Sequence, residues 1–183
     1  SPCDAFDTGH SSTGISAAMG YSIARDLRGG DEKVAVVIGD GSLTGGMAYE
    51  ALNGLAQLKT GCVVVINDNN MSIGKNVGGL SKYLNEIRLG NAYNELKTGV
   101  ESSLMGSKTG KKIAKVLKRS KDNIKQFFVP GMFFEELGIT YVGPIDGHDI
   151  NQMITTFQHA FRLDKPIIIH VKTKKGKGYG YAE

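Results

Sequence analysis

Two clusters of glycine, aspartate and asparagine hold the residue types best suited to a metal ion. Asp40 lies between two glycines, and Asn69 lies in the run Asn67-Asp68-Asn69-Asn70. Carboxylate and amide oxygens are ligands that Mg²⁺ and Ca²⁺ accept. Gly39 and Gly41 allow the backbone to turn tightly and to approach a ligand closely. A carboxylate aimed at a bound phosphate would repel it unless a cation lay between them, so the pattern indicates a divalent ion together with a phosphorylated ligand.

Each cluster follows a short apolar run that reads as a buried strand. Val34–Ile38 and Val63–Ile66 are β-branched and too short for helices. Between them, Leu43–Leu58 has apolar residues at helical spacing, which predicts a strand, helix, strand unit with parallel strands. In open parallel sheets, ligands bind beyond the carboxyl ends of the strands. We therefore expect Asp40 and Asn69 to be neighbours in space.

The same alternation recurs in the rest of the chain. Thr13–Leu27 has the apolar spacing of a helix that Gly29-Gly30 ends, and Ile139–Val142, Ile150–Leu163 and Ile167–Val171 read as strand, helix and strand. The predicted fold class is α/β, with an open, mainly parallel sheet and helices on both faces. A length of 183 residues predicts a single domain over residues 1–183.

Residues 74–130 interrupt this rhythm with polar, glycine- and serine-rich sequence. Within them, Lys111–Phe128 has the spacing of an amphipathic helix. An insertion of this size beside a predicted site is either a mobile lid or a surface excursion, and the sequence favours neither.

Charge and composition exclude several classes of protein. The net charge of +4 comes mostly from Lys108–Lys125 and Lys172–Lys177, whereas nucleic-acid binders usually carry a broader basic surface with interleaved aromatic residues. The second basic cluster fits either a phosphorylated ligand or a solvated tail. We expect no nucleic-acid partner. No run of about 18 apolar residues and no signal-peptide pattern appears, so neither membrane insertion nor secretion is indicated.

The two cysteines carry little chemistry. Cys3 and Cys62 match no metal-binding or redox spacing, and Cys62 opens an apolar run where a small buried thiol is expected. A reducing, cytoplasmic location fits this pattern.

Taken separately, the two clusters have structural explanations. Asp40 could cap the following helix, and the asparagine run could be a turn. Their joint placement at two adjacent strand ends favours a metal and diphosphate site. The pattern Gly39-Asp40-Gly41 followed by Asn67-Asp68-Asn69 resembles the diphosphate-binding motif of thiamine diphosphate enzymes. That resemblance implies the thiamine diphosphate-binding fold and the cofactors thiamine diphosphate and Mg²⁺.

The resemblance also assigns roles to individual residues. It places Asp40, the side chain of Asn69 and the main-chain carbonyl of Met71 on the metal. Gly41 and Ser42 would line the cofactor. The family also puts Gly9, His10 and Ser11 at the cofactor, and Lys175 and Tyr179 match positions beside it, with a solvated tail as the alternative for the last two.

Further stretches are similar to the 1-deoxy-D-xylulose-5-phosphate synthase family. They are Gly9-His10-Ser11-Ser12-Thr13, Gly39-Asp40-Gly41-Ser42-Leu43-Thr44, Asn67-Asp68-Asn69-Asn70-Met71-Ser72-Ile73, Phe134-Glu135-Glu136-Leu137-Gly138, Gly143-Pro144-Ile145-Asp146-Gly147-His148-Asp149 and Lys174-Lys175-Gly176-Lys177-Gly178-Tyr179. The resemblance implies a synthase that condenses pyruvate with glyceraldehyde 3-phosphate, releases CO₂ and supplies isoprenoid precursors. Another thiamine enzyme, such as a transketolase or a pyruvate dehydrogenase component, and a non-catalytic phosphate- or nucleotide-binding module are the alternatives.

The remaining histidines fit structural roles better. His148 lies in a turn-like Asp-Gly-His-Asp stretch, for which a structural turn is the favoured interpretation. His159 and His170 lie within predicted elements, and we expect no site at either of them.

Parts of the family's catalytic machinery have no counterpart here. A glutamate that the family places in a separate pyrimidine-binding domain matches no residue of this chain, and neither do further active-site histidines or a C-terminal domain. The resemblance therefore implies a fragment whose principal catalytic residues lie elsewhere. We expect it to be inactive alone, and to belong to an enzyme that forms homodimers, as is the family's habit.

Overall fold

The computed structural model describes residues 4–69, residue 79 and residues 131–181. The elements run in the order α1 (Gly14–Arg28), β1 (Ala35–Gly39), the 3₁₀-helix η1 (Ser42–Thr44), α2 (Gly46–Leu58), β2 (Val63–Asp68), α6 (Met132–Glu136), β3 (Thr140–Asp146), α7 (Ile150–Ala160) and β4 (Ile167–Lys172). In the described part of the chain, four strands form one sheet in the order β1-β2-β4-β3, and every neighbouring pair is parallel.

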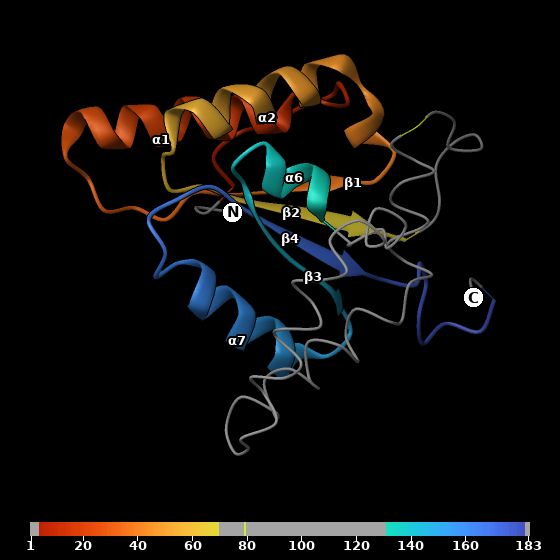
Figure 1. Cartoon of the computed structure of the whole chain (residues 1–183). Coiled ribbons are helices and arrows are strands. Elements are labelled where there is room, and N and C mark those ends of the chain that lie inside the picture. Colours follow the sequence, from red (N-terminus) through yellow and green to blue (C-terminus); the bar gives the residue numbers. More distant parts are fainter. Residues whose placement is uncertain (1–3, 70–78, 80–130, 182–183) are drawn as a thin grey trace, which may run out of the picture.

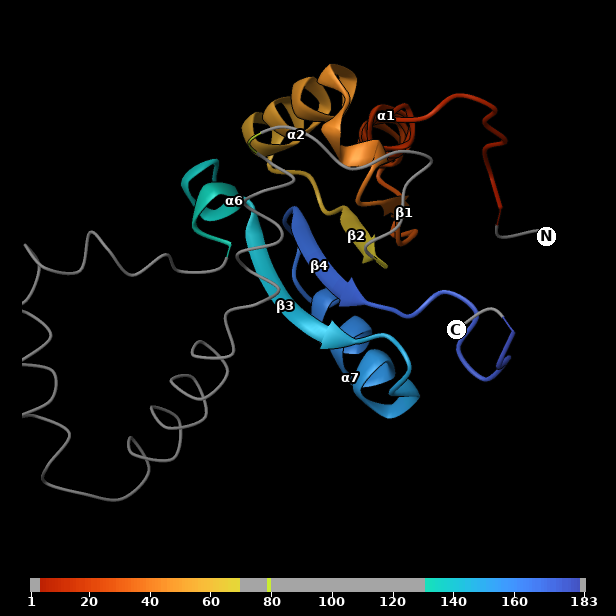
Figure 2. The ribbon, with the colours of Figure 1, turned by 90° about the vertical axis from the view of Figure 1, so that its right-hand side faces the viewer.

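The sheet lies between two unequal layers of helices. α1, α2 and α6 lie on one side of it, and α7 lies on the other (Figures 1 and 2). The central strands β2 and β4 are buried on both faces, as their unbroken apolar sequences predict. The predicted fold class, an open parallel sheet with helices on both faces, is confirmed.

Each face of the sheet has its own hydrophobic core. Beneath α1 and α2 the core contains Ile15, Ala18, Ile38, Leu43, Ala48, Ala51, Leu52, Leu55, Cys62, Val64, Ile66, Phe134, Ile139, Tyr141 and Ile168. Beneath α7 it contains Val63, Val65, Ile145, Ala160, Ile167, Ile169 and Val171. Alternate residues of β2 and β4 enter opposite cores because successive strand side chains point to opposite faces.

Helix boundaries follow local backbone chemistry. α1 ends at Arg28 and is capped by Gly29, which adopts the left-handed conformation with φ 67°. α2 begins at Gly46 rather than at the predicted Leu43, because Gly45 is extended (φ −77°, ψ 142°) and separates α2 from η1. Asp149 caps α7 by accepting a hydrogen bond from the Gln152 N–H at 3.0 Å.

Two features fall outside the sequence-based expectations. The short helix α6 was not predicted, and its Phe134 is fully buried against Tyr141 of β3. The predicted insertion 74–130 and the predicted helix Lys111–Phe128 lie outside the described residues, apart from residue 79.

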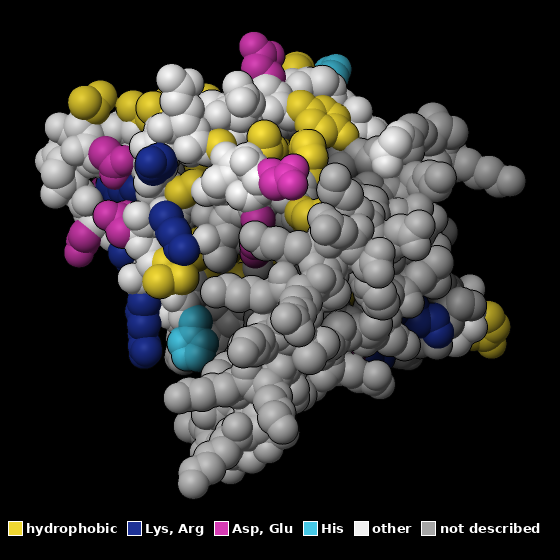
Figure 3. Space-filling model, in the orientation of Figure 1, with side chains coloured by type: hydrophobic (Ala, Val, Ile, Leu, Met, Phe, Trp, Pro, Cys, Tyr) yellow, Lys and Arg dark blue, Asp and Glu magenta, His cyan; other side chains and the backbone are white. Residues whose placement is uncertain are grey.

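Charged side chains are mixed over the visible described surface. Figure 3 shows basic side chains among acidic ones on the left of the molecule, and further basic side chains near the C-terminal loop at the right. Within the described residues, no helix is long and apolar enough to cross a membrane.

Candidate metal and diphosphate site

Asp40 and Asn69 follow neighbouring strands at the same edge of the sheet. Gly39, the last residue of β1, pairs with Asn67 of β2, and the Asp40 N–H donates to the Asn67 carbonyl at 3.3 Å. Asp40 is 6% exposed, and Asn69 is half-buried. The arrangement follows from the parallel register, because the carboxyl ends of paired parallel strands lie at the same edge of the sheet.

The loop that precedes α1 is tied to the loop that follows β1. The Ser12 hydroxyl donates to the Ser42 carbonyl at 2.7 Å. The predicted cofactor residues Gly9, His10 and Ser11 directly precede Ser12 in sequence. The contact therefore holds the loop that carries them against the loop that carries Ser42. Ser12 itself has a left-handed backbone with φ 71°.

His10 is exposed, and its ring has a defined polarity. Its Nδ1 lies 2.8 Å from the Ser11 carbonyl oxygen, which only accepts hydrogen bonds. In the neutral ring, Nδ1 therefore carries the proton and Nε2 is left as an acceptor.

The loop after β4 reaches the same edge. The Thr173 N–H donates to the Asp68 carbonyl at 2.9 Å, and the Thr173 hydroxyl donates to Asn67 Oδ1 at 2.6 Å. Lys175 and Tyr179 follow on this loop with exposed side chains, and Tyr179 is 62% exposed. The main chain of the loop is thus anchored at the site edge, whereas these two side chains extend into solvent. Met71, the predicted carbonyl ligand, lies outside the described residues.

His148 holds the turn after β3 against this loop. Its main-chain N–H donates to Asp146 Oδ1 at 2.9 Å, and its ring Nε2 accepts the Lys174 N–H at 2.8 Å. The first bond is that of a turn, and the second joins this turn to the loop after β4.

A buried polar chain lies beneath the site and was missed from the sequence. His170 of β4 is fully buried, with Nδ1 2.7 Å from the Tyr141 hydroxyl and Nε2 3.1 Å from Asp68 Oδ2. A histidine in the otherwise apolar run Ile167–Val171 was the available signal, because a buried polar group needs hydrogen-bonding partners. Its partners come from two other strands, which the sequence alone does not pair with it.

The donor set suits a hard cation of modest charge. Among the described residues, no group of three or more His, Cys, Asp and Glu side chains is placed to hold a metal. The predicted site needs less than that: one carboxylate from Asp40, one amide oxygen from Asn69 and oxygens from ligand and water, a set that Mg²⁺ accepts. A Cβ atom at Gly9 or Gly39 would meet no described atom within 4 Å, so the described residues leave room beside both glycines.

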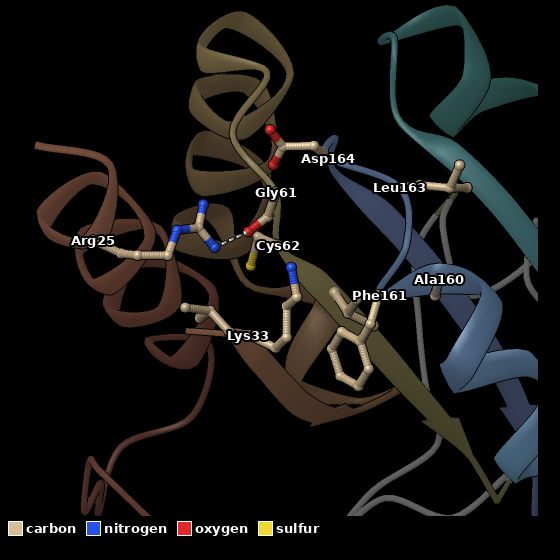
Figure 4. Close-up of a pocket in the computed structure, with 10 residues that line it drawn as sticks. Arg25, Lys33, Gly61, Cys62, Ala160, Phe161, Leu163 and Asp164 are labelled. Atoms are coloured by element: carbon tan, nitrogen blue, oxygen red, sulfur yellow. Dashed lines mark hydrogen bonds between the residues drawn. The ribbon is translucent and has the colours of Figure 1, made fainter. Parts of the chain in front are cut away.

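The opposite edge of the sheet carries a small pocket with room for about 20 Å³, enough for about one water molecule. Figure 4 shows Arg25 reaching from α1 to the Gly61 carbonyl, with Cys62 and Asp164 nearby. Burial raises the pKa of the Cys62 thiol, which keeps it protonated and unreactive. This is the inert buried thiol that the sequence predicts.

Arg25 is saturated with acceptors. Its five N–H groups donate to Asp26 Oδ1 (twice), the Thr60 hydroxyl and the carbonyls of Glu32 and Gly61, at 2.7–3.1 Å. Its side chain is 7% exposed. The guanidinium therefore joins α1 to the segment between α2 and β2 and has no donor left for a ligand.

Asp26 gives this cluster a pH dependence of known sign. A hydrogen bond from Thr60, together with Arg25, lowers the pKa of Asp26 below its usual 3.8. The resulting stabilisation is present above pH 3.8 and is lost as the pH falls through the lowered value. Because the Asp26 side chain is 49% exposed, Asp26→Asn should lower the free energy of unfolding at pH 7 by no more than about 1 kcal/mol. Urea denaturation from pH 7 to pH 2 should show the free energies of unfolding of the wild type and Asp26→Asn converging in acid. A difference that stays constant with pH would contradict the assignment of this stabilisation to the Asp26 carboxylate.

Gly45 tests the contact between the two loops. A Cβ atom at Gly45 would overlap the Ser12 hydroxyl and would lie 2.8 Å from Ser12 Cβ. Gly45→Ala should therefore lower the free energy of unfolding by about 1–3 kcal/mol. Ser12→Gly removes both clashing atoms and suits the left-handed backbone, so in that background the cost of Gly45→Ala should largely disappear.

Gly20→Ala is the matched control for the double-mutant cycle of Ser12 and Gly45. Gly20 lies in α1, and a Cβ atom there would meet no described atom within 4 Å, so alanine should stabilise the protein by about 0.5–1 kcal/mol. Thermal denaturation of the four Ser12 and Gly45 combinations and of Gly20→Ala gives every value required. An equal cost of Gly45→Ala in both Ser12 backgrounds would show that this overlap is not what matters.

The fold and the site edge define the architectural class. The structure is similar to transketolase from Campylobacter jejuni, with a TM-score of 0.55, 22% identity, and coverage of 92% of this chain and 20% of that one. It is also similar to an enzyme from Mycobacterium smegmatis described as thiamin diphosphate-dependent, with a TM-score of 0.54, 18% identity, and coverage of 91% and 22%. These likenesses identify an α/β fold of the kind those enzymes contain.

The chain belongs to the 1-deoxy-D-xylulose-5-phosphate synthase family, whose sequence profile matches residues 1–173. It is 56% identical over 180 residues to the 1-deoxy-D-xylulose-5-phosphate synthase of Clostridium beijerinckii, and 54% identical over 184 residues to that of Lachnoclostridium phytofermentans. The alignments cover 98% and 100% of this chain but 29% of each relative. The family predicted from the sequence is confirmed.

Proposed function

We propose that this chain is the diphosphate-binding domain of a thiamine diphosphate- and Mg²⁺-dependent 1-deoxy-D-xylulose-5-phosphate synthase. The complete enzyme would condense pyruvate with glyceraldehyde 3-phosphate to 1-deoxy-D-xylulose 5-phosphate and CO₂. The chain spans 29% of the length of the curated relatives, and the remaining domains would supply the pyrimidine-binding site and the principal catalytic residues. We expect a cytoplasmic enzyme that works as a homodimer.

One observation carries this proposal: the acidic residue after β1 and the asparagine after β2 lie at the ends of paired strands. The Asp40 N–H bonds to the strand end that carries Asn69. Asp40 would give a carboxylate oxygen to Mg²⁺, Asn69 an amide oxygen and Met71 a main-chain carbonyl. The metal would then neutralise the repulsion between Asp40 and the diphosphate.

The surrounding residues would bind and orient the cofactor. Gly41 and Ser42, together with Gly9, His10 and Ser11, would contact it from the two loops that the Ser12–Ser42 hydrogen bond joins. Lys175 and Tyr179 would approach from the loop after β4, whose lysines favour an anionic ligand. When bound, thiamine diphosphate supplies the chemistry that removes CO₂ from pyruvate and transfers the remaining two carbons. The protein holds it in place and sets its electrostatic surroundings.

Residues 74–130 belong to this proposal only as a segment of the single domain 1–183.

Isothermal titration calorimetry tests the proposal on the full-length protein that contains these residues. Thiamine diphosphate should bind in the presence of Mg²⁺ and bind much more weakly when the metal is removed with EDTA. ATP with Mg²⁺ is the control ligand, and a preference for ATP would favour a non-catalytic nucleotide-binding module. A coupled assay should detect synthase turnover in the full-length protein and none in residues 1–183 alone, and turnover by the short chain would contradict the assignment of catalytic residues to other domains.

A further inference from the structure

Three buried polar side chains on three different strands form a continuous chain beneath the site. Tyr141 of β3, His170 of β4 and Asp68 of β2 are 7%, 0% and 4% exposed. The Tyr141 hydroxyl lies 2.7 Å from His170 Nδ1, and His170 Nε2 lies 3.1 Å from Asp68 Oδ2. These hydrogen-bonded side chains lie in the core that contains Phe134. The ring of Phe134 stacks on that of Tyr141, with 5.8 Å between the ring centroids.

When the His170 ring is neutral and Asp68 is ionised, one arrangement of protons satisfies both contacts. An ionised carboxylate only accepts hydrogen bonds, so His170 Nε2–H donates to Asp68. Nδ1 of the neutral ring is then an acceptor, and the Tyr141 O–H donates to it. The carboxylate, which only accepts, thus selects the tautomer, and the Tyr141 hydroxyl completes the arrangement by donating to the remaining ring nitrogen.

The row of hydrogen bonds from Tyr141 through His170 ends at Asp68, at the end of the strand that Asn69 follows. Asp68 is the last residue of β2, and its carbonyl accepts the Thr173 N–H at 2.9 Å. Its side chain is held from the core side by His170, while Asn67 is held by the Thr173 hydroxyl. Because successive residues of an extended chain face opposite sides, fixing the Asp68 side chain in the core constrains the direction in which the next residue leaves the strand.

We propose that His170, whose ring is held by the Tyr141 hydroxyl, is a positioning residue that orients Asn69 for metal binding through its hydrogen bond to Asp68. This inference rests on the proposed function, since it concerns the same metal. Groups that orient metal ligands without touching the metal typically change metal affinity by about 10–100-fold when they are lost. If His170 only filled space in the core, replacing it would change the stability of the protein and leave the metal affinity of the folded protein unchanged.

Two substitutions of His170 separate these roles. His170→Gln can place an amide N–H near the position of Nε2 and retain the bond to Asp68. His170→Asn is shorter and reaches only the position of Nδ1, so it retains the contact with Tyr141 and loses Asp68. Both replace the ring by a smaller amide, and both should lower the melting temperature of the metal-free protein.

The measurement is the dissociation constant of Mg²⁺ in the presence of thiamine diphosphate, determined by calorimetry on the full-length protein. His170→Asn should raise it by about tenfold or more, and His170→Gln by less than about threefold. Tyr141→Phe keeps the ring stacked on Phe134 and removes only the hydroxyl. It should raise the constant measurably and lower the melting temperature less than either His170 variant does, and it decides the question if the His170 variants do not fold.

Equal affinities in wild type, His170→Asn and Tyr141→Phe would overturn the inference while leaving the proposed function intact. Equal weakening in His170→Asn and His170→Gln would also overturn it, because both would then act through packing. If the wild-type protein bound no thiamine diphosphate with Mg²⁺, the proposed function itself would fail, and this inference with it.

Discussion

Asp40→Asn in the full-length protein is expected to weaken Mg²⁺-dependent binding of thiamine diphosphate by at least about 100-fold. Even residues that merely orient a metal ligand cost about 10–100-fold, and Asp40 is the proposed carboxylate ligand itself. The amide keeps the shape of the side chain at a position that is 6% exposed, but it removes the negative charge that holds the cation. Calorimetry with and without Mg²⁺ measures the effect directly.

Asp31→Asn is the matched control, because Asp31 is an exposed aspartate in the loop before β1. It should bind the cofactor like the wild type. Melting temperatures of the metal-free proteins establish that both variants fold. Wild-type affinity in folded Asp40→Asn would remove Asp40 from the site and, with it, the main physical support for the proposed function.

The arrangement of the site edge was predictable because it depends on local patterns. Short β-branched runs bounded by glycine identify β1 and β2, and the helical spacing between them requires a crossover and hence parallel strands. Once the strands are parallel and adjacent, the positions of Asp40 and Asn69 at one edge follow without any long-range contact being known. The late start of α2 was missed, because the extended backbone of Gly45 gives no sequence signal distinct from that of a helix start.

The buried polar contacts were not predictable in the same way. His170 and Asp68 are separated by 102 residues in sequence, and their contact depends on the strand order β2-β4-β3. Periodicity places each residue on a strand but does not say which strands are neighbours. His170 was therefore assigned no site from the sequence, whereas the structure gives it two polar partners.

Arg25 was missed for a related reason. In the last turn of a helix, an arginine is normally exposed to solvent. The sequence gives no sign that the acceptors of Arg25 come from the Thr60–Gly61 segment. In the structure it closes the edge of the sheet opposite the site and forms the largest set of hydrogen bonds that a single side chain can donate. Its role is stability, in contrast to the charged residues of the site edge.

Arg25→Met should lower the free energy of unfolding by at least about 2 kcal/mol. Methionine fills much of the space but removes hydrogen bonds from a charged group to the part-buried carbonyls of Glu32 and Gly61 and to the buried Thr60 hydroxyl, and such bonds contribute about 1.5–3 kcal/mol each. In a domain of this size the melting temperature should fall by about 5 °C or more. Arg28→Met is the matched control: Arg28 lies on the same helix, is 68% exposed and pairs with Glu32, so its loss should cost less than about 1 kcal/mol. Thermal and urea denaturation of both variants measure the difference, and equal losses would show that the buried hydrogen bonds of Arg25 do not join α1 to the sheet edge.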